Sequence, residues 1–250
     1  MPIAYVRHLT SRHRTTQANR HLGFALCFVA GAINAGGFLA VQQYTSHMTG
    51  IVSSMADHIA LGAYDLARDC AGALLSFLAG AASTAVLVNY ARRRQMHSEY
   101  GLPLLVEAVL LLCFGVLGAW LSRIEGLFVP LTVMLLCFIM GLQNAVITKL
   151  SHAEIRTTHI TGIVTDIGIE LGKLLYWNSP RCSDQPAVRA NPQRIGLLGG
   201  LAGCFFVGGV IGAVGFKHVG YASTLPLAAI LVVLAGVPAF DDLWAWRQRR

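Results

Sequence analysis

One short polar string occurs twice in the sequence. Residues 45–52 read Thr-Ser-His-Met-Thr-Gly-Ile-Val, residues 157–164 read Thr-Thr-His-Ile-Thr-Gly-Ile-Val, and six of the eight positions are identical at an offset of 112 residues. A helix that begins in such a string presents free N–H groups and a partial positive charge at its N-terminus. Two such termini that meet in a water-poor interior suit an anionic or carbonyl group of a ligand. The residues expected to line this site are His47, Thr49, Gly50, His159, Thr161 and Gly162.

The same string has a plainer interpretation, in which it only caps two helices and allows them to pack closely. The N-caps expected from residue type are Thr45, Ser46, Thr157 and Thr158. Capping explains one threonine in each copy. It does not explain why the histidine and the second threonine recur in both copies.

Acidic residues inside otherwise apolar stretches form a second group of interest. His159, Asp166 and Glu170 are separated by seven and four residues, so they share one face of a helix. The offset of 112 equates this face with His47, Ser54 and His58. If the two faces converge, their imidazoles and carboxylates could relay protons or hold a divalent metal. The alternative is that both faces lie in water at the membrane interface.

Proton coupling is the chemistry that this pattern favours. Two carboxylates one helical turn apart repel each other in a dry site, so one of them would keep a proton near neutral pH. A metal is not predicted, because the helical spacing of these residues is not a ligand signature, and no cofactor motif is present. The residues expected to couple protons are Asp57, His58, Asp166 and Glu170.

Three more polar residues interrupt long apolar stretches. Gly31-x-x-Asn34 matches Gly141-x-x-Asn144 at an offset of 110 residues. Amides need partners in lipid, so these asparagines either contact a solute or cation or bond to a neighbouring helix. Both are included among the residues expected to line the solute site. Glu107 stands alone in its stretch, and it either reaches the headgroups or bonds to a neighbouring helix.

Composition identifies the environment in which these residues work. Of the 250 residues, 55% are hydrophobic and only 12% are charged, and the mean hydropathy is +0.58. These values exclude a disordered chain and indicate an integral membrane protein. The net charge of +7 comes from basic residues at the ends of apolar runs, which disfavours nucleic-acid binding. The six cysteines form no C-x-x-C pair, so neither zinc nor a disulfide framework is indicated.

The apolar runs predict an all-α, polytopic membrane protein. Each strong run is long enough for one helical crossing of the bilayer. The strong runs cover residues 22–41, 70–90, 102–121, 127–148, 195–216 and 223–240. The weaker runs 49–63 and 160–176 carry acids, histidine and glycine. Each weak run is either a short span or a half-helix that enters and leaves on the same side.

Positive charge decides between these topologies. With six crossings and a cytoplasmic N-terminus, 16 Lys and Arg face the cytoplasm and 3 face the far side, as the positive-inside rule requires. The string Leu-Pro-Leu at 102–104 recurs at 225–227, so three matched features occur in the same order in both halves. Three crossings in each half invert one half relative to the other, which predicts a 3+3 inverted repeat with two short re-entrant helices.

The expected organisation is a single membrane domain. It comprises a basic cytoplasmic segment 1–21, a first repeat 22–121, a second repeat 122–240 with a polar cytoplasmic loop at 178–194, and a cytoplasmic tail 241–250.

The strings Gly31-Ala-Ile-Asn-Ala-Gly-Gly-Phe38 and Ser46-His-Met-Thr-Gly50, together with residues 141–145 and 157–162, resemble the YoaK-type family of bacterial integral membrane proteins. The resemblance covers residues 22–240. Family members often carry an acid at the position of Asn34 and an asparagine at the position of Ile51, so this chain departs from the family at both. The resemblance implies a bacterial membrane location and leaves the activity open, because the function of the family is itself unknown.

The function that the sequence favours is transport of a small solute by a secondary transporter or a channel, with the polar site between the repeats. The alternatives are a membrane enzyme acting on a lipid or lipid-linked group, and a non-catalytic partner or sensor subunit; no catalytic motif is present. The expected location is the bacterial inner membrane with both termini in the cytoplasm. The expected partners are a solute of unknown identity and the lipid bilayer, and homo-oligomerisation is left open.

Overall fold

A computed structural model describes residues 16–96, 99–121, 128–150, 158–177 and 187–248. Within these ranges the chain is helical and contains no strand. The helices are α2 (Thr16–Val41), α3 (Met48–Ala60), α4 (Tyr64–Arg93), α5 (Gly101–Leu121), α6 (Phe128–Leu150), α7 (Ile160–Leu175), α8 (Pro192–Val219) and α9 (Thr224–Gln248), with the 3-10 turn η1 (Gly220–Ser223) before α9.

Five segments of the described chain are long and apolar enough to cross a membrane. They are Gln17–Val41, Tyr64–Arg93, Gly101–Trp120, Pro130–Leu150 and Pro192–Gly236. The last of them contains α8, η1 and the first half of α9. The short helices α3 and α7 are not among these segments, in agreement with the weaker apolar runs from which they were expected. The protein is therefore an all-helical membrane protein with several apolar helices.

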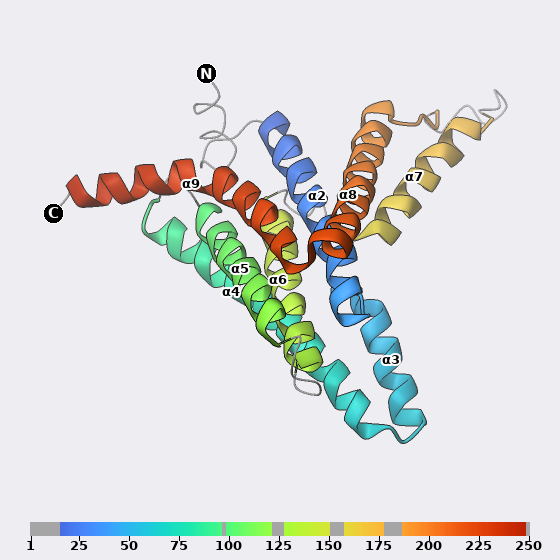
Figure 1. The fold of residues 1–250 in the computed structure, drawn as a ribbon. Coiled ribbons are helices and arrows are strands. Elements are labelled where there is room, and N and C mark those ends of the chain that lie inside the picture. Colours follow the sequence, from blue (N-terminus) through green and yellow to red (C-terminus); the bar gives the residue numbers. More distant parts are fainter. Residues whose placement is uncertain (1–15, 97–98, 122–127, 151–157, 178–186, 249–250) are drawn as a thin grey trace.

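The helices pack in pairs that join distant parts of the chain (Figure 1). The most extensive contacts are those of α2 with α8, of α4 with α6 and of α5 with α9. Helix α3 packs on α4, and α7 packs on α8. In Figure 1, α3 runs from the middle of the molecule toward the bottom, whereas α7 runs from the middle toward the top.

Glycines allow two of these pairs to approach until their backbones touch. A Cβ atom at Gly31 of α2 would collide with the Phe205 carbonyl of α8, and one at Gly141 of α6 would collide with the Phe77 carbonyl of α4. Residues 31 and 141 are the glycines that the sequence matched at an offset of 110. The helix pairs α2–α8 and α6–α4 therefore use the same kind of contact, because only a residue without a side chain fits at either position.

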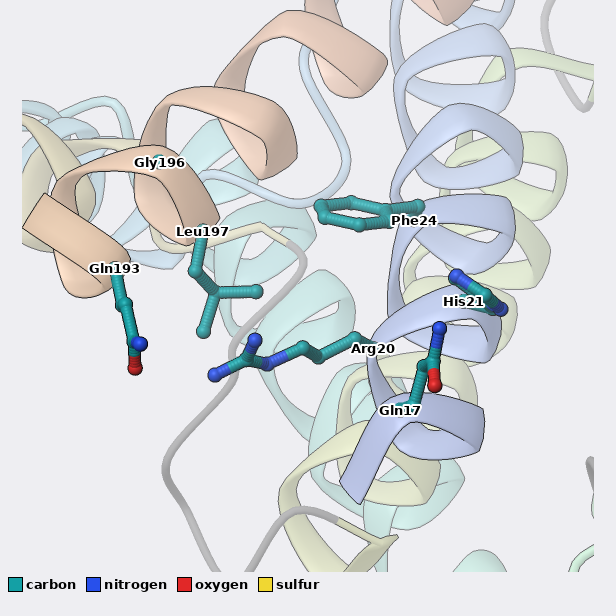
Figure 2. Close-up of a pocket in the computed structure, with 7 residues that line it drawn as sticks. All are labelled: Gln17, Arg20, His21, Phe24, Gln193, Gly196 and Leu197. Carbon is teal, nitrogen blue, oxygen red and sulfur yellow. The ribbon is translucent and has the colours of Figure 1, made fainter. Parts of the chain in front are cut away.

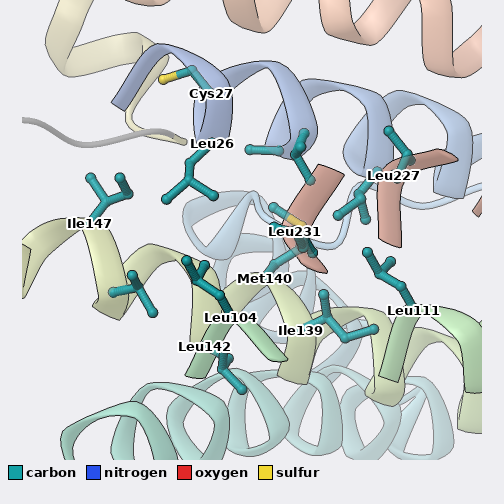
Figure 3. Close-up of a cluster of buried hydrophobic side chains, with 14 of the residues drawn as sticks. Leu26, Cys27, Leu104, Leu111, Ile139, Met140, Leu142, Ile147, Leu227 and Leu231 are labelled. Atoms are coloured by element: carbon teal, nitrogen blue, oxygen red, sulfur yellow. The ribbon is translucent and has the colours of Figure 1, made fainter. Parts of the chain in front are cut away.

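The buried core lies where α2, α5, α6 and α9 meet (Figure 3). Leu26 of α2, Met140 of α6, Leu111 of α5 and Leu231 of α9 are almost completely buried, and Figure 3 shows their side chains pointing into a common cluster. Many large apolar side chains elsewhere are exposed, among them Leu75, Val86 and Phe206. This distribution is expected of a membrane protein, because its outer surface faces lipid.

One buried hydrogen bond between α4 and α6 provides a test of this packing. Thr84 Oγ1 donates to the Leu142 carbonyl over 2.8 Å, and the Thr84 side chain is fully buried. We expect Thr84→Val, which keeps the shape and removes the donor, to lower the free energy of unfolding by about 0.5–1.5 kcal/mol. The measurement is reversible unfolding in mixed micelles.

The matched control is Ser83→Ala on the same helix. The Ser83 hydroxyl is exposed and donates to the Ala79 carbonyl of its own helix, so its removal should change stability little. Equal effects of the two substitutions would contradict the α4–α6 interface described above.

Candidate functional site

A polar groove lies between α2, α7 and the N-terminal part of α8. Its volume is about 670 Å³. The polar or charged side chains along it are those of Arg20, His159, Asp166, Asn191, Gln193 and Arg194, and the apolar part of its lining includes Ile163, Leu197, Leu198 and Leu201. The groove thus presents groups of both charges beside an apolar wall. Such a surface can hold a small polar or charged solute by several groups at once.

The charged groups on one side of the groove form a connected network. Arg194 Nη2 contacts Asp166 Oδ2 over 3.0 Å, and its Nη1 lies 3.9 Å from Glu170 Oε1. Lys173 Nζ donates to the same Glu170 oxygen over 2.8 Å. The backbone N–H of Asn191 donates to Glu170 Oε2, also over 2.8 Å. The network joins α7 to the start of α8, and it includes two of the acids that the sequence analysis singled out.

The start of α8 is fixed by local sequence. The Asn191 side chain caps the helix, because its Oδ1 accepts hydrogen bonds from the backbone N–H groups of Gln193 and Arg194 at 3.1 and 3.2 Å. Pro192 follows at the first helical position, where its missing N–H costs nothing. The cap holds the backbone of Arg194, and this backbone positions the guanidinium beside Asp166.

A second cavity of about 620 Å³ continues the groove along α2 (Figure 2). Residues of α2 and α8 line it, namely Gln17, Arg20, His21, Phe24, Gln193, Gly196 and Leu197. Figure 2 shows the Arg20 side chain extending from α2 toward Leu197 and Gln193 of α8. Arg20 borders both cavities, so its cation is available to a solute in either one.

The repeated string begins α3 and α7, but the caps differ from those expected. His47 and His159 occupy the N-cap positions, and neither side chain caps its helix with a hydrogen bond. The expectation that Thr45, Ser46 or Thr158 would be the N-cap is therefore wrong, and Thr157 lies outside the described residues. The reason is visible in the first copy, where Asn34 already binds the serine.

Asn34 fixes the turn between α2 and α3. Its Oδ1 accepts hydrogen bonds from the Ser46 hydroxyl at 2.8 Å and from the Ser46 backbone N–H at 3.4 Å. This contact places His47 directly at the start of α3. The matching Asn144 Oδ1 is buried without a partner in the described part of the chain. Asn34 thus bonds to the turn before α3, and whether Asn34 or Asn144 also contacts a solute stays a prediction.

The structure brings together only part of the expected site. His159, Gly162 and Asp166 line the groove, and Glu170 joins the network beside it. The groove lining does not include Asn34, His47, Thr49, Gly50, Asp57, His58, Asn144 or Thr161. Of these, His47, Thr49, Asp57 and Thr161 have exposed side chains. Whether any of them contacts a solute stays a prediction. Among the described residues, no three His, Cys, Asp or Glu side chains gather as a metal site would require.

Four polar residues of the groove, and the burial of one acid, are not predicted by the sequence. Arg20, Asn191, Gln193 and Arg194 belong to basic or polar segments that the sequence predicts to be cytoplasmic flanks. The pair Asn191-Pro192 could have predicted the start of α8, because asparagine is a common N-cap and proline is common at the first helical position. Arg194 lies in the first turn of this helix. The sequence predicts that Glu107 either reaches the headgroups or bonds to a neighbouring helix. In the structure it does not reach the surface. It is fully buried, and both of its carboxyl oxygens lack hydrogen-bond partners within the described residues.

Glu170 gives the groove a defined pH dependence. The hydrogen bond from Lys173 and then that from the Asn191 N–H lower the pKa of Glu170 below its usual value of 4.5. Glu170 is therefore ionised at neutral pH. A lowered pKa in the folded state stabilises the protein above pH 4.5, and this contribution is lost as the pH falls through the lowered value.

We expect acidification to loosen the junction of α7 and α8. Hydrogen exchange of the Asn191 amide should accelerate as the pH is lowered below 4.5, after correction for the intrinsic rate, because its acceptor becomes protonated. In Glu170→Gln the amide should already exchange rapidly at pH 5, with no further change on acidification. An Asn191 amide equally protected at all pH values in the unmodified protein would contradict the role of this carboxylate.

Comparisons with known proteins agree with this architecture. A family model described as "Protein of unknown function (DUF1275)" matches residues 22–237. The "UPF0700 transmembrane protein YoaK" of Bacillus subtilis (strain 168) is 24% identical over 159 residues, which cover 62% of this chain and 68% of that protein. No solved structure matches the chain significantly. Together with its long apolar helices, the family match shows that the chain is a transmembrane protein that belongs to the DUF1275 family.

Proposed function

We propose that the protein is a secondary transporter for a small polar or charged solute in the bacterial inner membrane. Two inverted halves of three crossings each, residues 22–121 and 122–240, move relative to each other and expose the groove to alternate sides. Both termini lie in the cytoplasm, and α3 and α7 are re-entrant. Inverted repeats of this kind are a common plan of secondary transporters.

The observation that carries this proposal is that helices of each half pack mainly against helices of the other half. Helix α2 of the first half packs on α8 of the second, and α6 of the second packs on α4 of the first. Both pairs meet at glycines that correspond in sequence, Gly31 and Gly141. The opposite directions of α3 and α7 in Figure 1 support the inversion. Two halves joined in this way can rock about a shared axis.

The turn between α8 and α9 supports the count of six crossings. The longest apolar segment, Pro192–Gly236, is interrupted by the 3-10 turn at Gly220–Ser223, where Gly220 has a φ of 69°. A positive φ is accessible to glycine at little cost, so the chain can reverse there. Division at this turn makes α8 and α9 two crossings, for six in total.

The position of the groove fits a site between moving parts. One wall is α2 of the first half, and the other is α7 and α8 of the second. The Asp166–Arg194 ion pair is about half exposed, so a solute with a carboxylate or ammonium group can compete for one of its partners. Arg20, on the opposite wall, adds a cation from the other half. Rocking of the halves would separate these two arginines.

Cysteine-accessibility mapping tests the topology. In a variant without native cysteines, single cysteines at positions 66, 97, 124 and 186 are labelled in intact cells with a membrane-impermeant maleimide. The proposal requires positions 66 and 124 to react from outside and positions 97 and 186 to react only after lysis. Eight crossings would instead expose only position 97 to the outside, which would rule out the inverted 3+3 arrangement.

Flux in proteoliposomes tests transport itself. Purified protein is reconstituted with a pH-sensitive dye in the lumen, and small amino acids, carboxylates and amines are added singly under an imposed pH gradient. We expect at least one class to change the internal pH faster than in protein-free vesicles. A membrane enzyme would instead give product in detergent solution with no vectorial change.

A further inference from the structure

The core of the helix bundle contains a carboxylic acid that neither the groove nor the ion-pair network uses. Glu107 of α5 is fully buried, and neither of its oxygens has a hydrogen-bond partner within the described chain. It lies on the helix face that also carries Leu104 and Leu111, three residues before and four residues after it. Figure 3 shows both leucines pointing into the core between α5, α6 and α9.

Gln143 of α6 provides an unpartnered acceptor at the same depth. Its side chain is fully buried, Nε2 donates to the Leu26 carbonyl over 3.3 Å, and Oε1 has no hydrogen-bond partner among the described residues. The Tyr100 hydroxyl donates to the Lys149 carbonyl, which places the start of α5 beside the end of α6. The two helices pack in opposite directions. Glu107 lies seven residues after Tyr100, and Gln143 lies six residues before Lys149, so both are about 10 Å from the Tyr100–Lys149 contact along the helix axes. Glu107 and Gln143 therefore lie at one level of the core.

Among the described side chains, no cation is placed to neutralise an ionised Glu107. Of the elements packed against α5, the described side chains of α9 include no titratable group. Helix α6 offers only the Cys137 thiol and Lys149, and Lys149 lies at the level of Tyr100. The charged residues of α4 lie in its first two and last turns, where Arg92 is bound to Glu99. The turn η1 carries two hydroxyl groups, those of Tyr221 and Ser223, and no cation. The Tyr221 ring meets Phe114 edge to face, two turns further along α5 than Glu107.

These surroundings favour a proton over a metal cation. An isolated carboxylate in an apolar interior is highly unfavourable, and neutralisation removes most of that cost. Hard metal cations require about six or more oxygen ligands, whereas three unpartnered oxygens are available on Glu107 and Gln143. A proton needs only one carboxylate to bind to. The O–H group that results needs one hydrogen-bond acceptor, and Gln143 Oε1 can be that acceptor.

We propose that Glu107 is an intramembrane proton-binding site, and that its neutral carboxyl group donates a hydrogen bond to Gln143 Oε1 in the bound state. The proton-binding site depends on the fold alone. Its use as the site of the coupling ion rests on the transport function proposed above. In that use, release of the proton requires water or a cation to reach the α5–α6 interface, so proton release accompanies separation of these helices.

Infrared spectroscopy of the full-length protein in lipid tests the site without any substrate. We expect the wild type at pH 7 to show a carboxylic-acid C=O band that is absent from Glu107→Gln. Gln143→Leu, which retains Glu107, should shift this band to higher frequency because the carboxyl group loses its acceptor. Glu170→Gln is the matched control, and it should leave the band unchanged because Glu170 is ionised at this pH.

Each result of this experiment is decisive for the site. Identical spectra of wild type and Glu107→Gln in the acid region at pH 7 would overturn the proposal, provided that both proteins are monodisperse and helical by circular dichroism. A band that disappears when choline is replaced by sodium at constant pH would show that a metal cation occupies the site instead. A band that is present and coupled to Gln143 in a protein without flux would support the proton site and reject its use in transport.

Discussion

Replacing Gly141 with alanine is expected to lower the thermal unfolding midpoint of the solubilised protein by roughly 5 °C, which corresponds to about 1–3 kcal/mol. The added Cβ would collide with the Phe77 backbone of α4, and backbone cannot rotate away as a side chain can. Gly31→Ala should cost a similar amount, because its Cβ would meet the Phe205 carbonyl of α8 in the same manner. The measurement is thermal unfolding in detergent, followed by the amount of monodisperse protein that remains.

Gly203→Ala on α8 is the matched control. Position 203 is helical and has open space where the Cβ would be built, so alanine should be neutral or slightly stabilising there. If Gly141→Ala is as stable as Gly203→Ala, the helices do not approach as closely as described. If only one of Gly31→Ala and Gly141→Ala is destabilising, the two helix pairs are not equivalent.

Arg194→Gln is expected to abolish solute-dependent flux, with a loss of at least about tenfold. The substitution removes the cation that lies 3.0 Å from Asp166 and 3.9 Å from Glu170. It lowers the net charge of the groove by one and removes a group that a solute anion can bind. A loss of one charge-assisted hydrogen bond alone accounts for a factor of this size. The measurement is the initial rate of the internal pH change in proteoliposomes.

Arg68→Gln controls for the loss of a positive charge. Arg68 makes an ion pair with Asp65 at 2.9 Å, but both side chains are largely exposed and neither residue lines the groove. Flux should be retained in this variant, because exposed pairs contribute little to structure. Equal loss in Arg68→Gln and Arg194→Gln would mean that surface charge, rather than the groove, limits the rate.

The apolar runs predicted the helices well, but not their ends. The run 70–90 became α4, Tyr64–Arg93, because charged residues can extend a helix beyond the apolar window that hydropathy detects. The caps were predicted incorrectly, since N-cap preference describes isolated helix ends and the Ser46 hydroxyl is bound by Asn34. The matched glycines at positions 31 and 141 were visible in the sequence, but their partners on α8 and α4 were not.

The candidate site was predicted only on the α7 side. The spacing of seven and four residues places His159, Asp166 and Glu170 on one face of a helix. Helical periodicity alone is enough to predict which residues share a face. The other wall depends on which helix packs against α7 and α8, which is a long-range property of the fold. Arg20 was therefore missed. Glu107 was misplaced for a related reason, because its sequence position does not reveal which face of α5 points inward.

The pairing of α2 with α8 also has a consequence for biosynthesis. The first apolar helix ends at Val41, and its partner begins only at Pro192. At about 5–20 residues per second, this interval of synthesis lasts on the order of ten seconds or longer. During this interval α8 is not yet synthesised, so the glycine face of α2 must contact lipid or the insertion machinery instead. Neither half can complete its own packing, so the two fragments should survive proteolysis in the cell only when they are produced together.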